Sequence, residues 1–404
     1  MKYDFLYFLG FFFVLLKETL APIMPVHSAE LADVFFLAYM ATGMKSSKAC
    51  VFWMAGALGF FTLSLLWSID PVWGLWGIRQ VFVLFIAMLA TDCYLRRTPE
   101  GIKNLLKAYL IASGLLVVFL LSNWGQLEQG ERLGAQMNES SDNQTLFNSN
   151  VFGLNLCYAL FAGYILYLRG SKNKLTRLVV LVASALVLYI ILMTGSRKAL
   201  FTLIIPFIII PLLGQKKSRL LLIIPIIIGS ISVGIYLIMK TPVLYDVLGS
   251  RLEDMINIAS DNVEGGEDVS RVFLIQYGLE WFQEKPFLGY GINNFRVLSD
   301  NTVMFAGRNF YAHNNYIELL VDVGIVGFIV YYSCYISFLK RLRHHSSDSY
   351  LNKWMVVLII VSLFLDIGMV SYYTFTSNLV KNILFFVTGS IKQQGKYVKQ
   401  TILK

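Results

Sequence analysis

The chain has 404 residues, of which 56% are hydrophobic and 15% are charged, and its mean hydropathy is +0.62. Its apolar runs repeatedly reach the roughly 20 residues that a helix needs to cross a bilayer, which excludes an ordinary soluble globular protein. The formal net charge of +9 does not indicate a nucleic-acid partner, because the basic residues form short clusters between apolar runs without an aromatic-basic stripe. Composition therefore predicts an all-α polytopic membrane protein.

The apolar segments, taken in chain order, predict about twelve transmembrane helices. The expected spans are 3–24, 29–44, 49–67, 73–93, 105–122, 148–168, 177–193, 198–214, 220–239, 316–339, 354–372 and 374–391. The first contains Lys17 and Glu18 and lacks a small-residue cleavage site, so we interpret it as a retained span rather than a signal peptide. The four cysteines fall in or beside spans, where packing is the expected role and a disulfide framework is not.

Charge predicts which side of the membrane each connection occupies. If the N-terminus is cytoplasmic, most of the 34 Lys and Arg residues lie on the cytoplasmic side, as the positive-inside rule requires. The long connections 123–147 and 240–315 then lie outside. We accordingly divide the chain into an N-terminal transmembrane bundle of about nine spans (1–239), an extracytoplasmic catalytic cap loop (240–315), and C-terminal transmembrane helices with a cytoplasmic tail (316–404).

The candidate chemical groups all fall on the predicted outer side. His313 ends the long loop, just before an apolar helix, and Arg271 follows Ser270 at the start of a stretch with helical spacing. Arg197 ends a short outer turn, Thr194-Gly195-Ser196-Arg197. Arginine presents a fixed, always charged fork that suits phosphate oxygens, and histidine exchanges a proton near neutral pH. Together they could hold a pyrophosphate and activate a hydroxyl.

Each of these residues also has a purely structural interpretation. Arg197 could anchor a helix end, since Lys and Arg near span ends commonly do so. Arg271 could pair with Glu267 or Asp268 in the first turn of an exposed helix. His313 and Asn314 could cap the helix that follows. Their joint appearance on one side favours the functional interpretation.

The order of these features resembles the O-antigen ligase and polymerase superfamily of bacterial inner-membrane glycan-joining enzymes, over roughly residues 50 to 335. The shared features are the Thr-Gly-Ser-Arg turn, a large external loop with Ser-Arg and Trp, a Gly-Tyr-Gly turn at 289–291, and His-Asn followed by Gly-x-x-Gly. The nine residues from Asn315 to Val323 separate His313-Asn314 from Gly324 with the spacing that the ligases show.

The resemblance implies a fold similar to the membrane-embedded GT-C glycosyltransferases and a metal-independent, inverting transfer from a polyprenyl-diphosphate-linked glycan. The active site would face the extracytoplasmic side of the bacterial inner membrane. Carried over residue by residue, Arg197 and Arg271 would neutralise the diphosphate leaving group, and His313 would orient or deprotonate the acceptor hydroxyl. No cofactor is expected, since the sequence has no clustered His/Cys ligands and no Asp-x-Asp pair. The partners would be the lipid-linked donor, an acceptor glycan and membrane lipids.

Further polar residues join the predicted substrate-binding set. Its members are Asn314, Arg79, Asn148, Asn150, Ser196, Ser270 and Tyr311. For Arg79 the alternative is a structural pairing with Glu18 or Asp33, and for the two asparagines that open the sixth span it is helix capping. Glu318 and Asp322 lie at i and i+4 on one helix face, where burial makes them functional or partnered. Lys381 has no assigned role.

Two questions stay open at the level of sequence. The acceptor could be another lipid-linked repeat unit, which would make the protein an O-antigen or capsule polymerase, or the lipid A–core, which would make it a ligase. We favour the polymerase, because the Phe-Asn-Ser-Asn and Ser-Arg contexts resemble surface-polysaccharide polymerases, although the His-Asn spacing favours the ligase. A lipid-linked glycan transporter or flippase is the alternative of another class; its path would be lined by intramembrane charges such as Lys17, Glu18, Arg79, Asp366 and Lys381. A non-catalytic scaffold would account for the spans but not for the grouping of Arg197, Arg271 and His313.

Overall fold

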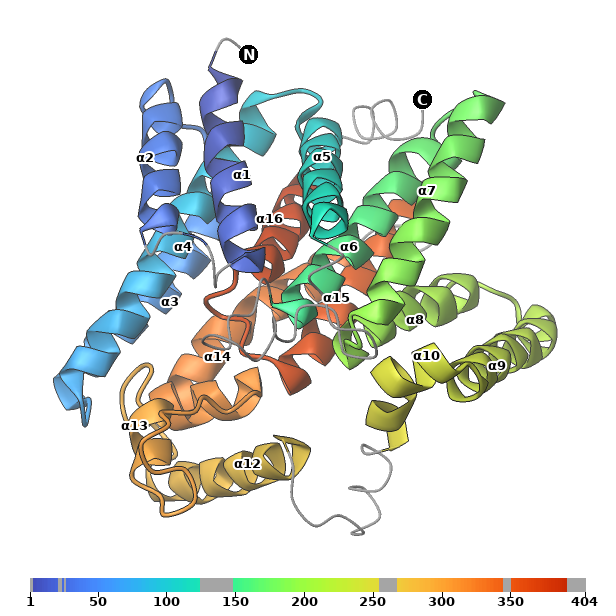
Figure 1. The fold of residues 1–404 in the computed structure, drawn as a ribbon. Coiled ribbons are helices and arrows are strands. Elements are labelled where there is room, and N and C mark those ends of the chain that lie inside the picture. Colours follow the sequence, from blue (N-terminus) through green and yellow to red (C-terminus); the bar gives the residue numbers. More distant parts are fainter. Residues whose placement is uncertain are drawn as a thin grey trace.

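The computed structural model shows a bundle of helices (Figure 1) and describes residues 3–20, 24, 27–123, 148–253, 267–343 and 350–390. Within these ranges there is no β-strand. The N-terminal half comprises α1 (Asp4–Thr19), α2 (Ser28–Ala41), α3 (Lys48–Leu63), η1 (Ser64–Trp67), α4 (Pro71–Arg97), α5 (Gly101–Ser122), α6 (Ser149–Gly163), η3 (Tyr164–Arg169), α7 (Lys174–Met193), α8 (Arg197–Leu212) and α9 (Lys217–Lys240). The remainder comprises α10 (Pro242–Leu244), η4 (Tyr245–Gly249), α12 (Glu267–Glu284), α13 (Phe295–Asp300), α14 (Asn315–Arg343), α15 (Tyr350–Gly368) and α16 (Phe375–Ser390).

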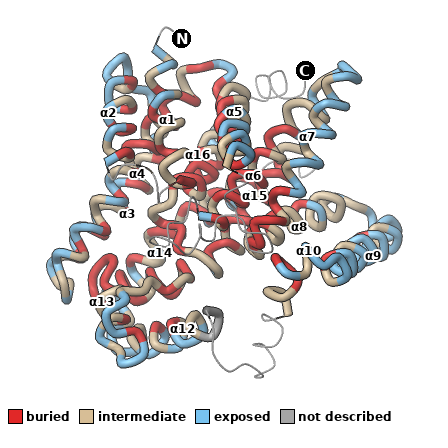
Figure 2. The backbone as a smooth tube through the Cα atoms, in the orientation of Figure 1, coloured by how far each residue is buried: buried red, intermediate tan, exposed pale blue. Residues whose placement is uncertain are grey.

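The expectation of an all-α polytopic membrane protein is confirmed. Eight helical segments in the described part of the chain are long and apolar enough to cross a membrane, and they correspond to eight of the twelve expected spans. The other four expected spans are occupied by α1, α2, α8 and α16, which have 16, 14, 16 and 16 residues. Helices α7 and α9 are apolar yet exposed along most of their length (Figure 2). Hydrocarbon is the surrounding that such surfaces require.

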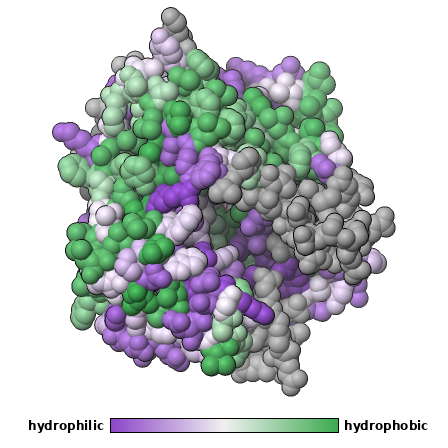
Figure 3. All heavy atoms as spheres, turned by 60° about the vertical axis from the view of Figure 1, so that its left-hand side comes forward, coloured by the Kyte–Doolittle hydropathy of each residue, from purple (hydrophilic) through white to green (hydrophobic). Residues whose placement is uncertain are grey.

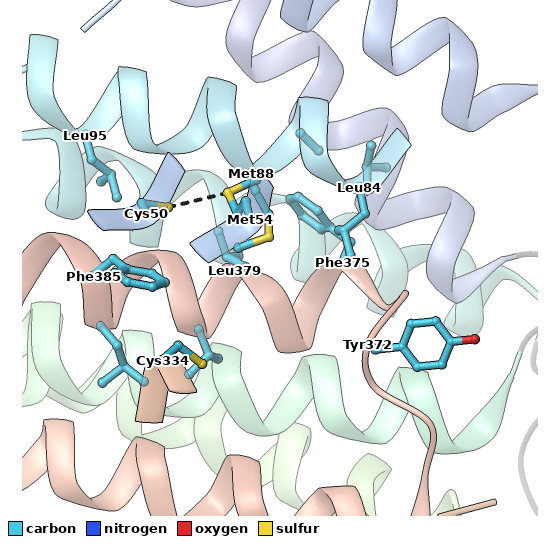
Figure 4. Close-up of a cluster of buried hydrophobic side chains, with 14 of the residues drawn as sticks. Cys50, Met54, Leu84, Met88, Leu95, Cys334, Tyr372, Phe375, Leu379 and Phe385 are labelled. Carbon is cyan, nitrogen blue, oxygen red and sulfur yellow. Dashed lines mark hydrogen bonds between the residues drawn. The ribbon is translucent and has the colours of Figure 1, made fainter. Parts of the chain in front are cut away.

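The centre of the bundle is packed by apolar and aromatic side chains. Figure 4 shows part of this core, where the Cys50 thiol lies 3.5 Å from the sulfur of Met54 and rings such as Phe385 fill the space between helices. On the N-terminal side, Tyr7 of α1 and Tyr94 of α4 stack with ring centroids 4.3 Å apart. All four cysteines are free and buried, which agrees with the packing role expected for them.

The segment that contains α12 and α13 lies at the end of the bundle opposite the start of α1 (Figure 1). In the space-filling view, hydrophilic residues gather at this lower end, whereas hydrophobic residues cover much of the surface above (Figure 3). Helix α12 packs closely against α14. Gly278 of α12 lies so near its neighbours that an added Cβ would overlap Ile317 of α14 and press on Phe295 of α13. A small apolar cluster, which includes the buried Leu274 and Phe305, holds this segment together.

Helix α14 is broken at Gly324, and the break receives the loop that follows α12. Gly324 has φ +63° and ψ −173°, a backbone conformation open essentially to glycine alone. The freed amides of Ile325 and Val326 donate to the carbonyl oxygens of Pro286 and Phe287 at 2.8 and 3.3 Å. A Cβ on Gly324 would overlap the backbone of Phe287. The docking of this loop onto α14 therefore requires glycine at position 324, the first glycine of the Gly-x-x-Gly element.

The Gly-Tyr-Gly turn completes the docking on the other side of the break. The amides of Tyr290 and Gly291 donate to the carbonyl oxygens of Val321 and Asp322 at 2.9 and 2.7 Å. The fully buried Asp322 carboxylate accepts the backbone amides of Asn293 and Phe295, both at 2.7 Å. Asp322 is thus a partnered residue that positions the turn.

Candidate functional site

The turn between α7 and α8 places two cations in the first turn of α8. Gly195 has φ +58°, and the Ser196 hydroxyl oxygen accepts the Ala199 amide at 3.3 Å, which is an N-cap. The same hydroxyl donates to Asn150 Oδ1 at 3.0 Å, so α6 fixes the turn from the side. Arg197 and Lys198 are the residues that follow this cap.

Arg271 enters the site from α12. The helix is fixed against α14 as described above, and Arg271 lies one turn before the buried Leu274. Helix α12 therefore brings Arg271 to the side of the bundle on which α8 begins.

His313 lies in the short segment between α13 and α14. Its φ of +54° is in the left-handed region, which is uncommon for residues other than glycine. The Asn314 side chain accepts the amides of Tyr316 and Ile317 at 3.0 and 3.2 Å and so caps α14. The ring of Tyr311 lies against the imidazole, with 3.9 Å between the ring centroids.

The three elements meet at one pocket of about 260 Å³. Arg197, Lys198, Arg271 and His313 supply its polar lining. The rest of the wall is mostly apolar and comes from α8, α12, α15 and the segment before α14: Phe201, Val272, Ile275, Ala312, Phe364, Leu365, Ile367 and Gly368. Phe201 and Phe364 contact each other, with ring centroids 5.3 Å apart. A group of cations thus lies beside an apolar surface, which is the arrangement that an amphipathic anion requires.

The surroundings of His313 keep its imidazole neutral. Burial, and after it the positive charges of Arg271, Lys198 and Arg296, together lower the pKa of His313 from 6.5 to about 3. These cations come from α12, α8 and α13, so they surround the ring from three elements. A neutral imidazole at pH 7 has a nitrogen lone pair available to accept a proton.

The pocket lining contains Arg197, Arg271 and His313 from the predicted site, but the other predicted residues lie outside it. Asn148 caps α6 by accepting the amides of Asn150 and Val151. Asn150 and Ser196 bond to each other and support the α8 turn. Asn314 and Tyr311 flank His313, and Ser270 precedes Arg271 in α12.

Arg79 lies away from this pocket and takes part in an ion pair. Its guanidinium contacts the carboxylate of Glu30 in α2 and lies over the Trp76 ring, 4.9 Å from the centroid. The expected structural partners were Glu18 and Asp33, and that expectation is wrong, because the packing of α2 on α4 presents Glu30 to Arg79. Glu18 instead accepts the backbone amide of Thr376 at 3.0 Å.

Two residues in or beside the pocket escaped the sequence reasoning, and the partner of a third could not be foreseen. Lys198, which lines the pocket, is the direct neighbour of Arg197, and its position in the first turn of a helix was the available signal. Arg296 follows the Asn293-Asn294 turn and lies close to His313. Glu318 was noticed as a buried carboxylate, but its partner, the Ala312 amide at 2.5 Å, could not be foreseen. Among the residues that the structure describes, no group of three or more His, Cys, Asp or Glu side chains could hold a metal ion.

Residues 181–332 match the family model described as O-antigen ligase. The match begins within α7, ends within α14, and includes Arg197, Arg271 and His313. The resemblance to the O-antigen ligase and polymerase superfamily is confirmed by this match. None of the curated proteins compared with the chain matches it.

Proposed function

We propose that the protein is a metal-independent, inverting glycosyltransferase that moves a polyprenyl-diphosphate-linked glycan onto an acceptor hydroxyl at the extracytoplasmic face of the inner membrane. The observation that carries this proposal is that Arg197, Lys198, Arg271 and His313 line one pocket together, beside an apolar wall. The cations suit the diphosphate, and the wall from α8 and α15 suits the first isoprene units. The match to the O-antigen ligase family model supports the same class of reaction.

The chemistry follows from the charges in the pocket. The bond between the anomeric carbon and the diphosphate oxygen breaks, and its electron pair leaves with the diphosphate. Guanidinium groups held in place before the reaction stabilise that developing negative charge, which a divalent cation would otherwise offset. The acceptor oxygen attacks from the opposite face of the sugar, so the anomeric configuration inverts, and the neutral His313 imidazole takes the hydroxyl proton.

For the acceptor we favour another lipid-linked repeat unit, which makes the protein a surface-polysaccharide polymerase. The residues around Asn148 and Arg271 resemble such polymerases in sequence. A ligase that transfers the chain to lipid A–core is the second candidate, favoured by the spacing from His313-Asn314 to Gly324 and by the description of the matched family model.

A transporter is less well supported by the bundle. Of the charges that could line its path, Arg79 is bonded to Glu30, and Glu18 is bonded to Thr376. Lys381 donates to Tyr331 and Asn378 at 2.9 and 3.2 Å, and Asp366 accepts the Tyr332 hydroxyl at 2.8 Å. These charges serve contacts between helices in the structure.

The test is a surface-glycan analysis of a deletion strain complemented with wild type, His313→Ala or His27→Ala. His27 is exposed and lies in the turn before α2, so its variant is the matched control. With His313→Ala, single lipid-linked repeats without long chains would identify a polymerase. Long lipid-linked chains that never reach their acceptor would identify a ligase. Normal glycan from a stably expressed His313→Ala protein would contradict the proposed chemistry.

A further inference from the structure

The conformation of His313 is unusual enough to need support from its surroundings. A left-handed backbone is sterically strained at a residue other than glycine, and His313 has a φ of +54°. Asn309, four residues earlier, also has a positive φ, of +44°. The segment 309–313 therefore holds a shape that its own backbone does not favour, and neighbouring side chains must maintain it.

The guanidinium group of Arg296 in α13 connects this segment to two other parts of the chain. Its Nε donates to Asn293 Oδ1 at 3.0 Å, and one terminal nitrogen donates to the Asn309 carbonyl oxygen at 3.4 Å. The other terminal nitrogen donates to the Tyr373 hydroxyl at 3.4 Å, in the connection between α15 and α16. The guanidinium carbon lies 5.0 Å from the centroid of the Tyr311 ring. One planar group of α13 thus joins the Asn309 backbone, the Tyr311 ring and the α15–α16 connection.

Glu318 supports the other end of the same segment. Its side chain is fully buried, and its Oε2 accepts the Ala312 amide at 2.5 Å. Arg296 and Glu318 attract each other electrostatically, so each supplies the opposite charge that a buried ion needs. Segment 309–313 is therefore held near its first residue by the Arg296 guanidinium and near its last residue by the Glu318 carboxylate.

We propose that Arg296 is a positioning residue which, together with Glu318, holds Tyr311 and His313 so that the imidazole faces Arg271 and Lys198 across the pocket. The catalytic consequence of this positioning rests on the proposed function, in which His313 is the base. Arg296 itself is absent from the pocket lining, so we assign it a positioning role and no contact with the diphosphate.

The arrangement also has an electrostatic consequence. The charged groups that face His313 are Arg271 from α12, Lys198 from α8 and Arg296 from α13, and all three lower its pKa along with burial. Removing the charge of Arg296 therefore raises the pKa of His313, whereas Arg296→Lys keeps a positive charge and loses the planar fork. The two variants separate the effect of charge from the effect of geometry.

The first experiment follows the four histidines by NMR in full-length protein with ¹³C-labelled imidazoles and no substrate. His313→Gln identifies the His313 signal. In wild type this signal should not titrate between pH 8 and pH 5. In Arg296→Met its chemical shift should differ from that of wild type, because the segment that carries the imidazole has lost its contacts with the guanidinium group. Arg308→Met is the matched control, because Arg308 lies in the connection between α13 and α14, just before the segment 309–313, and is exposed. A His313 signal unchanged in position and titration in folded Arg296→Met would overturn the proposal.

The second experiment measures transfer with lipid-linked glycan extracted from the deletion strain as the donor. Arg296→Met should lower kcat by about 10- to 100-fold with little change in donor KM, part of what a positioned base contributes. Arg296→Lys should recover part of that loss, and Arg308→Met should match wild type. A defect of Arg296→Met confined to donor KM would make Arg296 a phosphate ligand and overturn the positioning role. Wild-type protein without transferase activity would instead contradict the proposed function, while the NMR result would still decide the positioning.

Discussion

Replacing Gly324 by alanine should detach the Gly-Tyr-Gly loop from α14. Alanine at φ +63° and ψ −173° carries a backbone strain of about 1–3 kcal/mol. Its Cβ would also overlap the Phe287 backbone, so the hydrogen bonds from Ile325 and Val326 to the loop must open. The two hydrogen bonds contribute about 1 kcal/mol each. Together with a backbone strain of about 2 kcal/mol, the docked loop loses on the order of 4 kcal/mol of stability.

Hydrogen–deuterium exchange measures this loss directly. The amides of Tyr290, Gly291, Asn293 and Phe295 are all hydrogen-bonded to α14. If they exchange through opening of the loop, about 4 kcal/mol corresponds to roughly 1000-fold faster exchange in Gly324→Ala.

The matched control is Gly114→Ala in α5, where a Cβ would meet nothing within 4 Å. Helix propensity predicts a neutral or slightly stabilising effect there, of up to about 1 kcal/mol. Exchange of the loop amides within about threefold of wild type in folded Gly324→Ala would refute the argument that this glycine exists for docking.

Two further predictions concern the same region. The folded state keeps the pKa of His313 at about 3, so below pH 6.5 the unfolded chain binds the extra proton, and stability falls as pH falls from 6.5 towards 3. At pH 5 wild type should therefore have lost about 2 kcal/mol that His313→Gln retains; parallel pH profiles of the two thermal midpoints would contradict the assigned burial. Asp322→Asn should leave the amide of Asn293 or Phe295 without its acceptor and cost about 1–3 kcal/mol, visible as faster exchange of both amides. Equal exchange in Asp322→Asn and wild type would show that the carboxylate does not hold the turn.

The sequence was sufficient for those features that depend on local order along the chain. Apolar run length predicted the helices, because a bilayer imposes the same length on every span. The interval from His313-Asn314 to Gly324 also has a local cause. The interval is the length of helix between an N-cap and a break. Asn314 caps the helix with its side chain, and Gly324 adopts the backbone conformation that breaks it.

Features that depend on how helices rotate against each other could not be predicted in the same way. Arg79 pairs with Glu30 rather than with Glu18 or Asp33 because of how α2 lies on α4. Asn148 fitted both a ligand and a cap, and its hydrogen bonds show a cap. Arg296 gave no sequence signal, because its importance comes from three contacts with segments 3 to 77 residues away.

The location of the cations suggests an order of events under the proposed function. Without donor, burial in the first place, and then Arg271 and Lys198, keep His313 neutral but also make it a weak base, since protonating it would add charge to a buried and already positive pocket. A bound diphosphate offsets those charges, and the same linkage then raises the proton affinity of the imidazole. Under the proposed function, His313 is therefore a stronger base when the donor occupies the pocket, and deprotonation of the acceptor follows donor binding.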